Sequence, residues 1–213
     1  MRKPMPRHFT TMAIAMLAFT FGCEDSGGLG DGHDFGSNDP NIVVALGDSI
    51  TSGHNLASAD SYPAQLASMI GKNVVNEGKG AERSAGGRNR VDNVLRRYKP
   101  GFLLIFYGAN DVIHDVPHGD TIDNLRRIIT AAKENGTVPV IATLLPAYTE
   151  HTYMQGGISR LNPMIRELAS SEGVALADME SAFGTDESLL QDDGLHPGES
   201  GARLIAQVFA GVF

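Results

Sequence analysis

Residues 42–49 read IVVALGDS, and this stretch sets the fold of the chain. Its first five residues are apolar without interruption, which is typical of a strand buried on both faces of a sheet. The polar tripeptide Gly47-Asp48-Ser49 follows directly, at the place where parallel sheets commonly bind their ligands. The stretch therefore predicts a parallel strand with a polar turn at its carboxyl end.

The rest of the chain repeats this alternation between a β-rich run and a helical pattern. Further β-rich runs lie at residues 73–76, 102–106, 138–144 and 174–177. Apolar residues recur at helical spacing between and after them, at residues 62–70, 91–98, 122–132, 161–168 and 204–209, the fourth helix being opened by Asn162-Pro163. Parallel strands need a crossover, usually a helix, so five strands predict one sheet covered on both faces. We expect a three-layer α/β/α sandwich, a flavodoxin-like five-stranded parallel sheet in the order 2-1-3-4-5.

The start of the chain is typical of an export signal. Three cations precede an apolar run at residues 12–21, which is shorter than the roughly 20 residues of a spanning helix. We therefore expect residues 1–22 to be a signal peptide. Cys23, the only cysteine, follows directly, so the fold uses no internal disulfide.

The residues around Cys23 resemble a bacterial lipoprotein processing site, at which the cysteine is lipidated after cleavage. This resemblance implies an exported periplasmic or cell-envelope lipoprotein, and the alternative is an ordinary secreted protein. Residues 23–40 are rich in Gly, Asp and Ser. Such a segment buries too little apolar surface to offset its ordering entropy, so we expect a flexible acidic tether. Residues 41–213 then form a single domain.

The charge of the chain argues against one class of partner. Residues 1–22 contain three cations and no acidic residue, so their removal changes the formal net charge from −8 to −11. An acidic protein is repelled by phosphate backbones and by anionic bilayers. We therefore expect no nucleic acid partner. The sequence does not indicate an oligomeric state.

Four polar segments, far apart in the chain, each lie beside a predicted strand or helix. They are Gly47-Asp48-Ser49, Asn76-Glu77-Gly78-Lys79-Gly80-Ala81, Gly108-Ala109-Asn110-Asp111 and Asp193-Gly194-Leu195-His196. Together they supply a nucleophile, oxyanion donors, a carboxylate and a base. Acyl transfer needs all four at one point in space.

The fourth segment offers the base. Its spacing lets the Asp193 carboxylate bond the Nδ1–H of His196 while Nε2 faces a hydroxyl such as that of Ser49. Asp192 is a competing carboxylate, and a helix-entry loop or a weak metal pair is the alternative interpretation. Asp-x-x-His without further ligands is thin evidence for a metal, so we expect none. Four of the other histidines are expected to be surface loop residues, namely His54, His114, His118 and His151.

The remaining segments offer oxyanion donors. The side chain of Asn110 can donate to a developing oxyanion, or can simply belong to a turn. The amides of Gly80 and Ala81 lie close to the end of a strand. Asp48 and Asp111 are expected to cap nearby backbone N–H groups.

The four segments resemble the conserved blocks of the SGNH (GDSL) hydrolases over residues 41–213. The resemblance implies hydrolysis of esters or thioesters without a cofactor, with Ser49 as nucleophile, Asp193 and His196 as acid and base, and Asn110 in the oxyanion hole. The amides of Ser49 and of Gly80 or Ala81 complete that hole. The family has glycine where Ala81 stands, and alanine can serve there if its φ is negative.

The substrate is less well defined by the sequence. We expect a small-molecule or lipid ester of short to medium acyl chain. A carbohydrate O-acetylesterase or acyltransferase, and a non-catalytic envelope binding protein, are the alternatives. Three arginines near the second segment, Arg83, Arg88 and Arg90, either attract an anionic substrate or are solvated charges on a helix.

Overall fold

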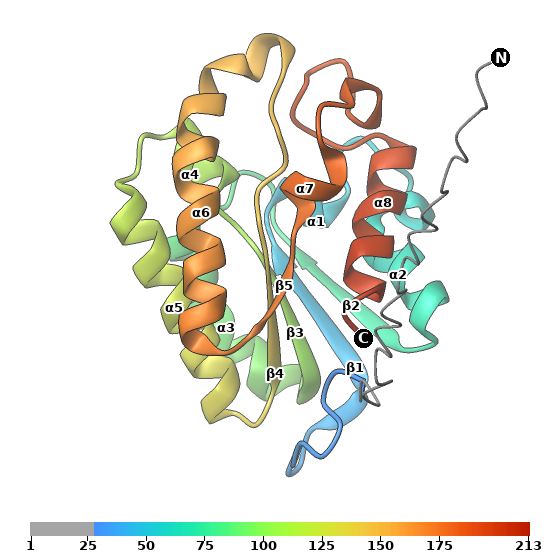
Figure 1. Ribbon diagram of the computed structural model, residues 1–213. Helices are drawn as coiled ribbons and strands as arrows, with labels where there is room; N and C mark the ends of the chain where they lie inside the picture. The colour runs from blue at the N-terminus through green and yellow to red at the C-terminus, as the bar shows by residue number, and fades with distance from the viewer. Residues whose placement is uncertain (1–27) are drawn as a thin grey trace, which may run out of the picture.

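The computed structural model describes residues 28–213, which form a three-layer α/β/α sandwich (Figure 1). A five-stranded sheet in the order β2-β1-β3-β4-β5 lies in the middle, and every neighbouring pair of strands is parallel. The predicted fold class and strand order are confirmed. The predictions for residues 1–22 and for Cys23 lie outside the described residues.

The core lies along the two central strands. The strands are β1 (Asp39–Gly47), β2 (Asn73–Gly78), β3 (Pro100–Phe106), β4 (Val138–Ala142) and β5 (Ala175–Ala177). The side chains of β1 from Val43 to Leu46 are fully buried, and every residue of β3 is buried. Helices on both faces exclude water from these strands, which is why their sequences are apolar without alternation.

Helices cover the sheet because each parallel crossover passes over one face. α2 (Tyr62–Ile70) packs against α8 (Glu199–Ala210) on one face, and α3 (Ser84–Tyr98), α5 (His118–Glu134) and α6 (Gln155–Glu172) cover the other (Figure 1). The remaining elements are short: α1 (Ser49–Ser52), α4 (Ala109–Ile113), α7 (Met179–Phe183) and the 3₁₀ turns Ser58–Asp60, Thr149–Met154 and Glu187–Leu189.

The register brings three strand ends level with one another. Gly47, the last residue of β1, pairs with Gly78 of β2 on one side and with Phe106 of β3 on the other. The segments that follow these strands therefore meet at the carboxyl edge of the sheet. They are three of the four polar segments of the sequence.

One helix boundary differs from the prediction. α6 begins at Gln155, and Pro163 lies inside it rather than at its start. The buried side chain of Asn162 accepts a hydrogen bond from the N–H of Leu144 at 2.8 Å and donates one to its carbonyl at 3.1 Å. Asn162 therefore joins the middle of α6 to the segment after β4 and does not cap the helix.

The amino-terminal segment also differs, because residues 28–38 are not a free tether. Leu29 and Phe35 pack against the core, with the ring of Phe35 5.4 Å from that of Phe102. The N–H of Leu29 donates to the carbonyl of Phe213 at 3.1 Å. β1 consequently begins at Asp39, before its apolar run. Two apolar side chains are enough here because they cover the otherwise open amino end of the sheet.

Candidate active site

The first polar segment forms a tight turn from β1 into α1. A Cβ on Gly47 would lie 2.7 Å from the carbonyl oxygen of Phe106, so only glycine fits between the strand ends. The buried Asp48 caps α1 by accepting a hydrogen bond from the N–H of Ile50 at 2.9 Å. Ser49 is thereby the first residue of α1, at the carboxyl edge of the sheet.

The structure brings Ser49 and His196 together across 147 positions of sequence. The Nε2 atom of His196 lies 2.9 Å from the Oγ of Ser49, and its Nδ1 atom lies 2.6 Å from the Oδ2 of Asp193. The side chain of His196 is 12% exposed and that of Asp193 is 27% exposed. This order of hydroxyl, imidazole and carboxylate can transfer a proton from the hydroxyl to the ring.

The local sequence holds the carboxylate in place. The second oxygen of Asp193 accepts hydrogen bonds from the N–H groups of Leu195, at 2.9 Å, and His196, at 3.0 Å. Gly194 has a φ of +68°, and a Cβ there would overlap with the carbonyl oxygen of Tyr148. The compact Asp-Gly-Leu-His turn therefore depends on glycine at its second position.

Burial and hydrogen bonding have opposite effects on the pKa values of His196 and Asp193. Burial lowers the pKa of His196 below its ordinary value and outweighs the opposing effect of Asp193. Burial by itself raises the pKa of Asp193, but the hydrogen bonds from His196 and the two amides outweigh it and leave that pKa lowered. At neutral pH the pair is a neutral imidazole beside a carboxylate, which is the state of a general base.

Asn110 lies in α4, which follows β3, and its side chain faces the first segment. Its Nδ2 donates to the Oδ2 of Asp48 at 3.1 Å. Both side chains are buried, and burial raises the pKa of Asp48 to about 7 despite the hydrogen bonds it accepts. An amide nitrogen carries two hydrogens, so this bond occupies only one of the two donors of Asn110.

The second segment runs beside the first. The N–H of Lys79 donates to the carbonyl of Gly47 at 2.9 Å, and the N–H of Glu82 closes a turn on the carbonyl of Lys79 at 3.2 Å. Ala81, in the third position of this turn, has a φ of +57°. The negative φ that alanine would need to take the place of glycine here is therefore not met. The turn needs a left-handed residue at this position, which is the physical reason to find glycine there.

Gly80 and Ala81, the two candidate backbone donors to the oxyanion, are neighbours in this turn. Both are exposed residues, and among residues 28–213 no hydrogen bond joins either of them to Ser49. Gly80 and Ala81 lie in the turn that follows β2, whose last residue pairs with the end of β1 beside Ser49.

Two histidines lie closer to the site than the sequence suggested. The ring of His54 lies 4.2 Å from that of His196, between centroids, at an interplanar angle of 35°. The Nδ1 of His151 lies 2.8 Å from the carbonyl oxygen of Asp193. His54 is an exposed surface residue, as expected, but it is also a neighbour of the imidazole. Its position only five residues after Ser49 was the available signal.

Asp111 has a structural place, as expected. It is buried, and it accepts hydrogen bonds from the N–H of Ser84, at 2.9 Å, and from its Oγ, at 2.6 Å, at the start of α3.

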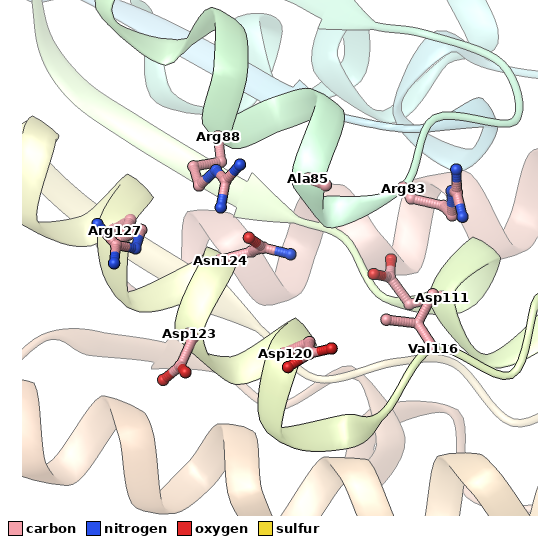
Figure 2. Close-up of a pocket in the computed structure, with 9 residues that line it drawn as sticks. All are labelled: Arg83, Ala85, Arg88, Asp111, Val116, Asp120, Asp123, Asn124 and Arg127. Atoms are coloured by element: carbon pink, nitrogen blue, oxygen red, sulfur yellow. The ribbon is translucent and has the colours of Figure 1, made fainter.

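Figure 2 shows Asp111 at one end of a cavity of about 400 Å³ between α3 and α5. Arg83, Arg88 and Arg127 line this cavity together with Asp120 and Asp123. Neither Ser49 nor His196 reaches it.

A second cavity, of about 580 Å³, borders the site at Asp193, although neither Ser49 nor His196 lines it. Its lining is polar and consists of Asn55, Glu150, Gln191, Asp192 and Asp193. Nearby, Met154 is buried in the core, while the ring of Tyr153 is 65% exposed.

Within residues 28–213, no group of three or more His, Cys, Asp or Glu side chains could hold a metal ion. In the same part of the chain, no helix is both long enough and apolar enough to cross a bilayer.

The family of the chain follows from comparison with known proteins. The sequence model of the GDSL-like lipase/acylhydrolase family matches residues 45–204. The chain belongs to this family, as the four segments predicted, and it is a carboxylic ester hydrolase. The matched region runs from within β1 into α8, so it includes all four polar segments.

Individual relatives agree with this assignment. The chain is 27% identical over 173 residues to thioesterase 1/protease 1/lysophospholipase L1 of Escherichia coli K12, covering 79% of this chain and 81% of the relative. It is 25% identical over 243 residues to the uncharacterized lipoprotein YqeF of Bacillus subtilis, covering 93% and 95%. A solved structure of a G-D-S-L family protein from Desulfitobacterium hafniense has 26% identity and a TM-score of 0.74, covering 81% of this chain and 99% of that one.

Proposed function

We propose that the chain hydrolyses carboxylic esters and thioesters of short to medium acyl chains, with Ser49 as nucleophile, His196 as base and Asp193 as its partner. The observation that carries this proposal is the pair of contacts made by the imidazole, 2.9 Å to Ser49 and 2.6 Å to Asp193. The lowered pKa of His196 supports it, because a base must be unprotonated at the working pH.

In the proposed reaction, Ser49 Oγ attacks the acyl carbonyl carbon and its proton passes to Nε2 of His196. The tetrahedral intermediate collapses, the bond to the alcohol or thiol breaks, and the leaving group takes the proton from His196. Water, deprotonated by His196, then cleaves the acyl-serine and releases the acid. Asp193 holds the ring with its proton on Nδ1.

The oxyanion of the intermediate is held by the N–H of Ser49, the N–H of Gly80 or Ala81, and the side chain of Asn110. The free hydrogen of the Asn110 amide and the adjacency of the Lys79–Glu82 turn to β1 support this hole. Loss of one such donor typically lowers turnover by about 10²–10³-fold.

The test of this function is Ser49→Ala, with Ser52→Ala on the same helix as the matched control. Ser49→Ala should abolish hydrolysis of p-nitrophenyl butyrate and covalent labelling by a fluorophosphonate probe, while Ser52→Ala keeps both. Near-normal turnover in Ser49→Ala would refute the assignment of the nucleophile. Lack of labelling in the unmodified protein would favour a non-catalytic binding protein.

The polar lining of the cavity beside Asp193 supports the acyl-chain range. A long acyl chain needs an extended apolar groove, and Asn55, Glu150 and Gln191 do not provide one. A series of p-nitrophenyl esters from two to sixteen carbons should peak at the short end. A maximum at twelve or more carbons would contradict this part of the proposal.

The same cavity favours a second candidate, a carbohydrate O-acetylesterase. Amide and carboxylate side chains such as those of Asn55, Gln191 and Asp192 suit an alcohol rich in hydroxyl groups. Release of acetate from an acetylated polysaccharide, at a kcat/KM above that for p-nitrophenyl acetate, would establish this candidate over a general esterase.

We further propose that residues 1–22 are removed on export and that Cys23 carries a lipid anchor in the cell envelope. The resemblance of residues 20–23 to a processing site and the similarity to a lipoprotein of Bacillus subtilis support this. Cys23→Ala should move the full-length protein from the membrane fraction to the soluble fraction of an expressing bacterium. Recovery of the unmodified protein in the soluble fraction would leave a secreted protein as the better interpretation.

A further inference from the structure

One guanidinium joins the segments that carry the proposed active site. Arg90 lies in the second turn of α3, and its side chain is only 11% exposed. Its Nε donates to Oε2 of Glu82 at 2.8 Å, and its Nη1 donates to Oε2 of Glu77 at 2.9 Å. Its Nη2 donates to the carbonyl of Glu77 at 2.6 Å and to the hydroxyl of Tyr107 at 2.7 Å, with a longer contact of 3.4 Å to the carbonyl of Gly47.

Each partner of Arg90 lies within a few positions of a proposed site residue. Gly47 precedes Ser49 by two residues, Glu82 follows Ala81 directly, and Tyr107 precedes Asn110 by three. The guanidinium of Arg90 thus bonds to the carboxyl ends of β1 and β2, to the turn after β2 and to the residue after β3. No other side chain among residues 28–213 donates hydrogen bonds to all of these segments.

The partners are also bonded to neighbouring side chains, so the network is closed. The hydroxyl of Tyr107 donates to Oε2 of Glu82 at 2.6 Å, and the hydroxyl of Tyr98 donates to Oε1 of Glu77 at 2.7 Å. Burial and the bond to Glu82 raise the pKa of Tyr107 well above its usual range, so its hydroxyl stays a donor. A network in which every member is satisfied fixes the geometry of its members.

The sequence of α3 is suited to this network. Gly86 and Gly87 lie inside the helix, where glycine costs about 1 kcal/mol relative to alanine. A Cβ on either residue would come within 2.5 Å of a partner of Arg90, from Gly86 to the side chain of Glu82 and from Gly87 to the ring of Tyr107. The two glycines allow α3 to approach closely enough for Arg90 to reach the strand ends.

Loss of Arg90 would release the turn beside Ser49. The side chains of Glu77 and Glu82 are 17% and 15% exposed, and Arg90 is the cation that both contact. Glu82 also contacts Lys79, at 3.8 Å, but that side chain is 58% exposed, so without Arg90 the carboxylate of Glu82 must turn toward water. If the side chain of Glu82 turned toward water, the backbone of Ala81, the residue before it, would shift.

We propose that Arg90 is a positioning residue for ester hydrolysis, which sets the distance between the nucleophile turn and the oxyanion donors through its bonds to Glu82, Tyr107 and the strand ends. This inference rests on the proposed function. It assigns Arg90, one of three arginines considered for attracting an anionic substrate, an internal role instead. Misplacement of reacting groups by about 1 Å can cost about 10²-fold in rate.

The test compares Arg90→Met and Arg90→Lys with the unmodified protein, using p-nitrophenyl butyrate well below each thermal midpoint. Arg90→Met should lower kcat by about 10- to 100-fold, with KM changed less than about threefold. The rate of covalent phosphonylation should fall in parallel. Arg90→Lys should not restore kcat, because one ammonium cannot replace the planar fork. Tyr107→Phe, which removes one link, should lower kcat several-fold.

Arg166→Met is the matched control. Arg166 also pairs with two carboxylates, those of Asp178 and Glu180, and neither lies beside a proposed site residue. It should lower the thermal midpoint but leave kcat within twofold. If Arg90→Met does not accumulate as folded protein, Arg90→Lys and Tyr107→Phe decide the question.

The possible outcomes separate the two proposals. A normal kcat in Arg90→Met despite a lowered midpoint, or full recovery in Arg90→Lys, would overturn the positioning role and leave the nucleophile assignment intact. Hydrolysis by Ser49→Ala would overturn the proposed function, whatever the Arg90 variants do.

Discussion

The left-handed conformation of Ala81 leads to an unusual prediction, that a glycine should stabilise this protein. Ala81 has a φ of +57° in an exposed turn closed by the 3.2 Å hydrogen bond from Glu82 to Lys79. An L-residue with a Cβ loses about 1–2 kcal/mol in this region relative to the right-handed one. Glycine has no such penalty, and an exposed methyl group gives little packing energy in return.

The expected magnitude is the difference between two terms. Ala81→Gly relieves about 1–2 kcal/mol of backbone strain, and the greater freedom of glycine in the unfolded chain takes back about 0.4–1 kcal/mol. The net increase in unfolding free energy is therefore about 0–1.6 kcal/mol, with a midpoint of about 0.8 kcal/mol. Because the turn keeps its conformation, kcat toward p-nitrophenyl butyrate should stay within about twofold of the unmodified protein.

The assay is equilibrium unfolding in urea, with Ala57→Gly as the matched control. Ala57 is equally exposed, but its φ is −64°, which any residue adopts without strain. The same chemical change should therefore lower stability there, by about 0.4–1 kcal/mol. Opposite signs at the two positions support the conformational argument. A loss of stability in both variants would refute it, and would show that residue 81 does not need a positive φ.

Three other predictions follow from the site. His54→Ala should raise the pKa of His196, because the charge interaction with His54 contributes to lowering that pKa. The acid limb of the kcat/KM profile should therefore move to higher pH, and a shift to lower pH would contradict this. Burial raises the pKa of Asp48 to about 7, above its unfolded value near 4, so its ionisation destabilises the fold as pH rises between these values. In the unmodified protein this lowers the unfolding free energy, measured in urea, by up to about 4 kcal/mol between pH 4 and pH 8. Asp48→Asn should remove this pH dependence, and an unchanged pH dependence would count against the assignment to Asp48. Gly194→Ala should lower kcat at least about tenfold through overlap with Tyr148, whereas Gly173→Ala, at a φ of +61° in open space, should affect only stability.

The order of the sheet was predictable because it depends on local patterns. Five apolar runs separated by helical periodicity allow few arrangements once crossovers must be right-handed. The proximity of Ser49 to His196 was accessible in the same way, since Ser49 follows β1 and His196 precedes α8, and strands end where such helices begin. The distance and hydrogen-bond geometry between Ser49 and His196 could not be predicted, because they depend on the turn that Gly194 makes against Tyr148.

What the sequence did not reveal involves contacts between distant residues or the conformation of single residues. The φ of Ala81 depends on the turn type, which spacing alone cannot fix. The bonds of Arg90 join residues up to 43 positions away, although the paired glycines in its helix were a signal of close packing. Phe35 looked like an isolated apolar residue in a polar stretch, and it is Phe102, far along the chain, that gives it a place to pack.

If Cys23 carries the proposed lipid, the docked amino-terminal segment would also constrain which esters can reach Ser49. Residues 28–38 cover the amino end of the sheet, and β1 then runs nine residues, or about 26 Å, to the edge where Ser49 lies (Figure 1). Gly28 is five residues from Cys23, a span of at most about 18 Å. A lipid on Cys23 would therefore hold the amino end of the sheet toward the membrane and Ser49 away from it. An active site in that orientation meets dissolved or polymer-bound esters before it meets the acyl chains of its own bilayer. If Cys23 carries the proposed anchor, its orientation would favour the same polar esters that the polar lining beside Asp193 suits.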